Sequence, residues 1–260
     1  MSMKITALTE NTCPGGEFGT EHGLSLYIET ESRRILFDMG QTALFAENAE
    51  KLGIDLSAVD LAVVSHGHYD HGGGLLRFLE LNQRAPVYIR RSAFETHYHG
   101  SERYIGLNPT LLNSRRLVFT GEVFPIEEGL SLYACCDREP AYLMEESGLS
   151  VERDGKLLPE DFCHEQYLLI EEQGKKILIS GCSHKGILNL AHWFRPDVLV
   201  GGFHLSKLAP GEKLRGYAER LDSYDTDFYT CHCTGEEQFV FMKKYMKNLS
   251  YLSAGSCIWI

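Results

Sequence analysis

Four potential metal ligands lie within six positions of the chain, at His66, His68, Asp70 and His71. Imidazole nitrogens and carboxylate oxygens are ligands that Zn²⁺ and similar divalent cations accept. In a turn, two histidines two positions apart can point toward one cation, while Asp70 and His71 can face a second. The three glycines at 72–74 let the backbone pass close to such ions. The spacing therefore indicates a site for two metal ions.

The elements around this motif are those that would position it. Residues 59–65 are mostly apolar and rich in β-branched side chains, which is typical of a strand buried on both faces. A helix is expected to begin near Leu75. The alternative is a histidine-rich surface turn, but such turns seldom contain a carboxylate or follow a buried strand.

Three segments in the second half repeat one pattern, in which an apolar run is followed by small residues and a histidine. These histidines are His184, His204 and His232. Open sheets place their sites beyond the ends of their strands. One metal centre would explain the recurrence.

His164 is a further candidate, because it precedes an apolar run that returns through Gly174 toward Cys182. A hairpin here would bring His164 and Cys182 to the same end. Cys231 and Cys233 flank His232, and alternation along a strand favours interpreting them as packing residues.

Strands and helices alternate in both halves, which predicts an α/β (α+β) fold of four layers, αββα, with two packed sheets and helices outside. The 260 residues suit a single domain over 1–260. Residues 92–145 are the least regular part and are predicted to form an insertion or lid. His97 and His99 fall in this segment and are interpreted as part of a mobile loop over the site.

Composition limits the partners. The formal net charge of −11 argues against a nucleic-acid backbone, which requires a basic face. It leaves room for an anionic small molecule, since bound metals reverse the local field. No apolar run reaches the roughly 18–20 residues of a membrane span. The first residues show no secretory signal and the eight cysteines contain no CxxC pair, so a reducing cytoplasm is expected.

These motifs carry a resemblance to a known family. The HxHxDH run, a histidine before a later strand and a last histidine near the C-terminus resemble the metallo-β-lactamase superfamily over most of the chain. Asp38 resembles the superfamily's early strand-end aspartate, which supports the metal loop. One branch is especially similar, in the motifs HEQ at 164–166, GCSHKGI at 181–187, GGFHL at 201–205 and HCTG at 232–235. Its members bear the name 7,8-dihydropterin-6-ylmethyl-4-(β-D-ribofuranosyl)aminobenzene-5′-phosphate synthase, although many bacterial relatives have no evident need for methanopterin.

The resemblance implies two divalent ions, with Zn²⁺ expected and Mn²⁺ or Fe²⁺ as alternatives. His66 and His68 would bind the first ion, and Asp70, His71 and His232 the second. Either His164 or His184 would complete the first site, with His184 preferred because it follows a strand end directly.

The chain departs from the superfamily at the bridging position, where Cys182 replaces the usual aspartate. A metal deprotonates a nearby thiol, so Cys182 is a candidate ligand, and a small buried hydrophobe is the alternative.

The expected chemistry is hydrolysis of an ester, phosphodiester or related bond of a small molecule by metal-activated water. Asp70 would orient the water or take its proton, and His204 would bind substrate and stabilise developing negative charge. Lys185 could contact a substrate phosphate, with solvated surface charge as the alternative. Two other functions remain open: a pterin-diphosphate-dependent transferase, and a metal-loaded binding or sensing module with little turnover.

Overall fold

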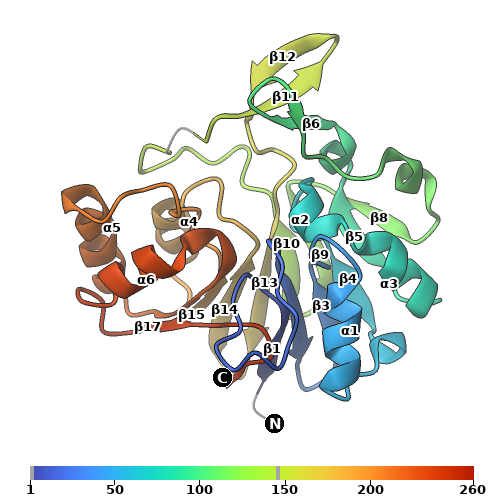
Figure 1. Ribbon diagram of the computed structural model, residues 1–260, viewed down its shortest axis with the longest axis horizontal. Helices are drawn as coiled ribbons and strands as arrows, with labels where there is room; N and C mark the ends of the chain where they lie inside the picture. The colour runs from blue at the N-terminus through green and yellow to red at the C-terminus, as the bar shows by residue number, and fades with distance from the viewer. Residues whose placement is uncertain (1–2, 145–146) are drawn as a thin grey trace. The chain divides into compact units, whose positions relative to one another are not determined.

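The structure is a computed structural model that describes residues 3–144 and 147–260 (Figure 1). The chain divides into two compact units, each with its own sheet and its own core. The first unit comprises residues 3–121, 147–166 and 253–260, and the second comprises residues 122–144 and 167–252. Among the described residues, no helix is long and apolar enough to cross a membrane.

The main sheet of the first unit has seven strands. In spatial order they are β18 (Cys257–Trp259), β1 (Lys4–Thr9), β2 (Ser25–Glu29), β3 (Arg34–Phe37), β4 (Leu61–Val63), β5 (Val87–Arg90) and β8 (Leu117–Thr120). From β3 to β8 the neighbours run parallel, so their carboxyl ends share one edge of the sheet. The strand expected over residues 59–65 is β4, and Val59, Val63 and Val64 are fully buried around it.

Two helices cover this sheet, α1 (Leu44–Lys51) and α3 (Leu75–Leu81). Phe45 of α1 and Phe78 of α3 belong to one buried apolar cluster with Leu36 and Ala62 of the strands. Between β4 and α3 lies the single-turn helix α2 (Tyr69–Gly72), which contains the end of the histidine motif. The predicted helix near Leu75 is confirmed.

A smaller sheet in the same unit has the order β12 (Lys156–Pro159), β11 (Leu149–Arg153), β6 (Thr96–His99) and β7 (Arg103–Tyr104). Strands β12, β11 and β6 are labelled at the top of Figure 1. The short 3-10 helices of this unit are η1 (Leu56–Ala58), η2 (Arg91–Phe94) and η3 (Pro109–Asn113).

The second unit has a seven-stranded sheet of its own. Its order is β17 (Leu249–Tyr251), β16 (Asp227–Thr230), β15 (Val198–Gly201), β14 (Lys175–Ser180), β13 (Tyr167–Glu172), β10 (Leu130–Tyr133) and β9 (Val123–Glu127). Strands β14 to β17 run parallel. The predicted hairpin through Gly174 is confirmed by the antiparallel pairing of β13 with β14, and Gly174 takes a positive φ of 76° in its turn.

Helices α4 (Ile187–Phe194), α5 (Glu212–Asp222) and α6 (Glu236–Met242) pack on this second sheet, brown to red in Figure 1. Leu190, Leu214 and Met242, one from each helix, join Leu199 and Phe228 of the strands in one buried cluster. The 3-10 turn η4 (His232–Thr234) follows β16.

Of the segment 92–145, residue 145 lies outside the described residues, and residues 92–144 are more regular than the sequence indicated. They supply β8 to the first main sheet, β6 and β7 to the small sheet, and β9 and β10 to the second main sheet. His97 is fully buried on β6. This differs from its interpretation as a residue of a mobile loop, because the side chain is enclosed by neighbours described below.

Candidate metal centre

The carboxyl ends of the parallel strands β3 and β4 place Asp38 beside Ser65. Asp38 is fully buried and has a φ of 58°, a left-handed conformation in which aspartate is one of the few tolerated side chains. Its Oδ1 accepts a hydrogen bond from the Ser65 amide at 2.7 Å, and its Oδ2 accepts one from Ser65 Oγ at 2.7 Å. His71 Nδ1 lies 2.7 Å from the same Oδ2. Asp38 therefore joins both ends of the histidine motif.

These contacts determine which ring nitrogen each histidine presents. A carboxylate can only accept, so His71 Nδ1 carries the proton and Nε2 keeps its lone pair. Ser65 Oγ gives its single hydrogen to Asp38, so it accepts from His66 Nδ1, 2.8 Å away. His66 therefore also presents Nε2 as a lone pair. Hydrogen-bonding of the far ring nitrogen in this way is typical of metal-ligating histidines.

The three histidines of the motif form one group. The ring centroid of His66 is 4.5 Å from that of His68 and 4.1 Å from that of His71. Burial holds the pKa of His68 well below its usual value, and the neighbouring His164 acts in the same direction. The neutral imidazole is the form that binds a metal.

Asp70 lies on α2 at the edge of this group. Its Oδ2 is 3.8 Å from His71 Nε2 and 3.2 Å from Nε2 of the exposed His22. His22 was not predicted, because no local pattern connects it with the motif. Its position next to a candidate catalytic carboxylate follows only from the tertiary fold.

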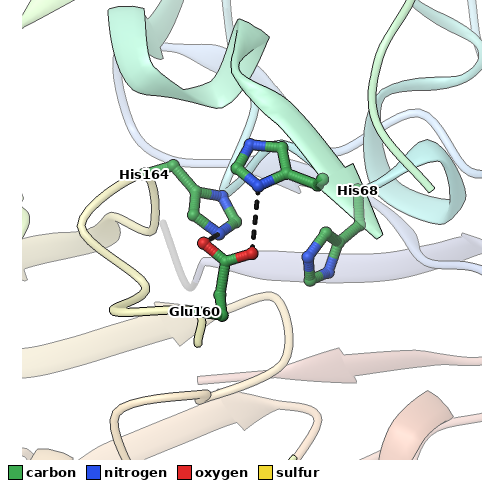
Figure 2. Close-up of side chains that lie close together, drawn as sticks. His68, Glu160 and His164 are labelled. Carbon is green, nitrogen blue, oxygen red and sulfur yellow. Dashed lines mark hydrogen bonds and ion pairs between the residues drawn. The ribbon is translucent and has the colours of Figure 1, made fainter. Parts of the chain in front are cut away.

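His164 is buried in the same unit, with its ring centroid 5.1 Å from that of His68. Nδ1 accepts a hydrogen bond from the Gly67 amide at 2.8 Å, and Nε2 lies 3.2 Å from Glu160 Oε1 (Figure 2). Burial lowers the pKa of His164, although Glu160 opposes that effect. Both nitrogens face protein groups, which is the arrangement of a supporting residue. The ligand role of His164 stays a prediction.

In the second unit, the candidate residues follow the ends of parallel strands, as predicted. Ser183 after β14, His204 after β15 and His232 after β16 all have positive φ values, of 58°, 53° and 50°. Such conformations cost free energy in residues other than glycine and concentrate at functional sites. The rings of His184 and His204 are 4.3 Å apart, so these two strand ends meet.

A cysteine cluster lies at the same strand ends. One ligand atom each of Cys182, His204 and Cys233 lie within 4.8 Å of one another, and the His204 amide donates to Cys233 Sγ at 3.3 Å. Burial raises the pKa of the Cys233 thiol, but hydrogen bonds with Cys182 and His204 outweigh it and hold that pKa well below its usual value. Cys233 is therefore a polar neighbour of Cys182 in addition to the packing residue that the sequence indicated.

Lys185 is buried, with 5% of its surface exposed, so the alternative of a solvated surface charge does not describe it. Its carbonyl accepts a hydrogen bond from Asn189 Nδ2 at 2.8 Å, which joins it to the first turn of α4. Its role in substrate binding stays a prediction.

Comparison with known proteins identifies the family. The model of the metallo-beta-lactamase superfamily matches residues 19–204, which is more than half of the chain. The chain belongs to the metallo-beta-lactamase superfamily. Its fold is confirmed by a solved structure, Tm1679, described as a metal-dependent hydrolase of the beta-lactamase superfamily. That structure has a TM-score of 0.82, 30% identity and coverage of 99% of both chains.

Two proteins of Methanocaldococcus jannaschii are also similar. One is uncharacterized, with 31% identity over 98% of this chain and 100% of the relative. The other is named 7,8-dihydropterin-6-methyl-4-(beta-D-ribofuranosyl)-aminobenzene-5′-phosphate synthase, with 28% identity over 99% of this chain and 96% of the relative. The predicted resemblance to this branch is confirmed.

Members of the metallo-beta-lactamase superfamily typically bind divalent metals and are mostly hydrolases. The donors present here fit such ions, since His66 and His71 each have their lone pair on Nε2, and the carboxylate of Asp70 lies 3.8 Å from His71 Nε2. That Cys182, His184 and His232 complete the metal sites stays a prediction.

Proposed function

We propose that this protein is a metal-dependent hydrolase that acts on an ester, phosphodiester or related bond of a small molecule. The observation that carries the proposal is the Asp38–Ser65 pair, which sets His66 and His71 in the ligand tautomer. In this tautomer each of the two histidines has its lone pair on Nε2, the atom that can ligate a metal ion.

A divalent ion held by these residues would activate water for attack at neutral pH and would polarise a carbonyl or phosphoryl oxygen. Asp70 orients the attacking water or takes its proton, and His22 holds that carboxylate by its 3.2 Å contact. His204 donates a hydrogen bond to negative charge that develops on the substrate, and Lys185 contacts a substrate phosphate. The proposed site would hold two Zn²⁺ ions, with Mn²⁺ or Fe²⁺ as alternatives.

The test combines metal analysis of the purified protein with hydrolysis assays on a chromogenic phosphodiester and a panel of lactones and thioesters. We expect about two metal ions per chain. His68→Ala and His184→Ala should each lose metal and activity, whereas the control His192→Ala, which replaces an exposed histidine, should retain both. Bound metal without turnover of any substrate would contradict the hydrolase.

A second candidate is the reaction named for the M. jannaschii relative, because that likeness extends over 99% of this chain. In this reaction a carbon–nitrogen bond would join the dihydropterin methylene to the amine nitrogen of the aminobenzene while diphosphate leaves and the amine loses a proton. The assay offers a dihydropterin diphosphate with the β-ribofuranosylaminobenzene 5′-phosphate and measures diphosphate release. Release that requires both substrates would favour the synthase over the hydrolase.

A further inference from the structure

Glu160 is buried between two histidines and close to His68 of the histidine motif (Figure 2). Its Oε2 lies 3.0 Å from His97 Nδ1, and its Oε1 lies 3.2 Å from His164 Nε2. All three side chains have no exposed surface. A carboxylate at this depth is costly unless hydrogen bonds compensate for its lost hydration.

The hydrogen bonds identify the donors. His164 Nδ1 accepts from the Gly67 amide, so its proton is on Nε2, the nitrogen that lies 3.2 Å from Glu160 Oε1. His97 Nε2 lies 3.2 Å from the carbonyl of Ser92, which can only accept, so that nitrogen is protonated too. Burial raises the pKa of Glu160, but its bonds with His164 and His97 outweigh the effect and hold that pKa well below the usual range. An ionised Glu160 therefore lies within ion-pair distance of both rings.

Gly67 connects this cluster to the metal ligands, because it stands between His66 and His68. A Cβ at position 67 would collide with the carbonyl of Ala93 and lie 2.8 Å from His97 Nε2. The backbone at Gly67 therefore packs directly against the cluster, and the hydrogen bond from its amide to His164 Nδ1 holds it in that position.

We infer that Glu160 is a positioning residue for the first metal site: it orients His164, which holds the Gly67 amide and with it the loop that carries His66 and His68. This inference rests on the proposed function only in taking His66 and His68 as metal ligands. It assigns a role to a carboxylate that touches no substrate.

The same side chains have a competing explanation. One ligand atom each of His68, His97, Glu160 and His164 lie within 4.8 Å of one another, so they could hold a cation themselves. His164 disfavours it, because its Nδ1 accepts from the Gly67 amide and the nitrogen that faces Glu160 therefore carries a proton. A cation site becomes one outcome of the test.

The test compares Glu160→Gln with Glu160→Ala. A glutamine amide can accept from His164 through its oxygen and donate to a neutral His97 through its nitrogen, so it preserves both contacts without the charge. We expect Glu160→Gln to bind Zn²⁺ within about threefold of the parent protein, and Glu160→Ala to bind it about 10- to 100-fold more weakly. Zinc affinity is measured by competition with a chromophoric chelator, and zinc stoichiometry by elemental analysis. Glu152→Ala, on the exposed face of β11, is the matched control.

Two outcomes would overturn the positioning role. Unchanged affinity in Glu160→Ala would show that the loop does not need the cluster. Equal losses in both variants, with one ion fewer per chain, would identify the cluster as a cation site. Failure of the hydrolase proposal can be told apart from these outcomes. It would appear as bound metal without turnover, and the zinc affinities of the parent, Glu160→Gln and Glu160→Ala proteins would keep their expected order.

A second pair keeps the inference testable if Glu160→Ala does not fold. His164→Asn retains an acceptor near the Gly67 amide, whereas His164→Leu does not. We expect the asparagine variant to bind zinc more tightly than the leucine variant. Equal and severe losses would make His164 a direct ligand and would overturn its supporting role.

Discussion

Asparagine at position 38 should weaken metal binding without unfolding the protein. In Asp38→Asn, the side-chain oxygen still accepts from the Ser65 amide, and asparagine tolerates the φ of 58° as well as aspartate does. The amide nitrogen replaces Oδ2, which faces His71 Nδ1 at 2.7 Å. Two donors cannot face each other, so His71 must move its proton to Nε2, the atom that would bind the metal.

The size of the effect follows from these contacts. Loss of a hydrogen-bonded partner behind a metal-ligating histidine costs about 10- to 100-fold in affinity. That range corresponds to about 1.4–2.8 kcal/mol. The ion bound by His71 should be affected most, because Ser65 Oγ can still accept from His66 Nδ1. The free energy of unfolding of the metal-free protein should fall by about 1–2 kcal/mol for the altered Ser65 and His71 hydrogen bonds.

The assay titrates the metal-free variant with Zn²⁺ against a chromophoric chelator and measures urea unfolding of the same sample. Asp55→Asn is the control, since Asp55 is a surface carboxylate that also accepts a backbone hydrogen bond. A folded Asp38→Asn protein with the parent zinc affinity would refute the tautomer argument. An Asp38→Asn variant that does not fold would show that the main role of Asp38 is to hold the ends of strands β3 and β4 together.

Three further expectations concern packing and metal. Gly67→Ala should lower the free energy of unfolding by about 1–3 kcal/mol, because the new methyl collides with the backbone of Ala93. An unchanged midpoint of urea denaturation would contradict this close packing of Gly67 against Ala93. Asn48→Ala should cost about 1–3 kcal/mol by leaving the backbone groups of Leu8 and Gly19 without their buried partner, while metal content stays the same. Chelation of the metal should abolish hydrolysis and lower the melting temperature. The free energy of unfolding should fall by about 2.7 kcal/mol if the free metal had been present at 100 times its dissociation constant. Added Zn²⁺ should restore both the activity and the melting temperature. Activity that survives chelation would contradict a metal-dependent enzyme.

The sequence was most informative where the chemistry is local. His66, His68 and His71 gather in one buried group because a short turn after a buried strand leaves them little freedom. Asp38 could be expected there from the family resemblance, and parallel pairing of β3 with β4 explains why it reaches Ser65. The fold class follows from strand–helix alternation in the same way.

The supporting cluster could not be predicted because it depends on pairing between distant segments. Strand β6 pairs with β11 in a register that sets His97 opposite Val151, and the chain then returns through β12 to Glu160. Neither register nor partner is encoded in the pattern of residues 92–145. The one local signal was the spacing of Glu160 four positions before His164, which has little meaning until the fold puts both beneath Gly67.

The strand ends share a backbone property that links fold and function. Asp38, Ser183, His204 and His232 each follow a parallel strand, and each has a positive φ. Such a conformation costs of order 1–3 kcal/mol per residue and persists only where the surroundings over-determine it. At Asp38 the compensation is visible in three contacts of 2.7 Å to its carboxylate. One of these contacts is the hydrogen bond from His71 Nδ1, so the residue with the costly backbone conformation is also the one that sets the tautomer of His71.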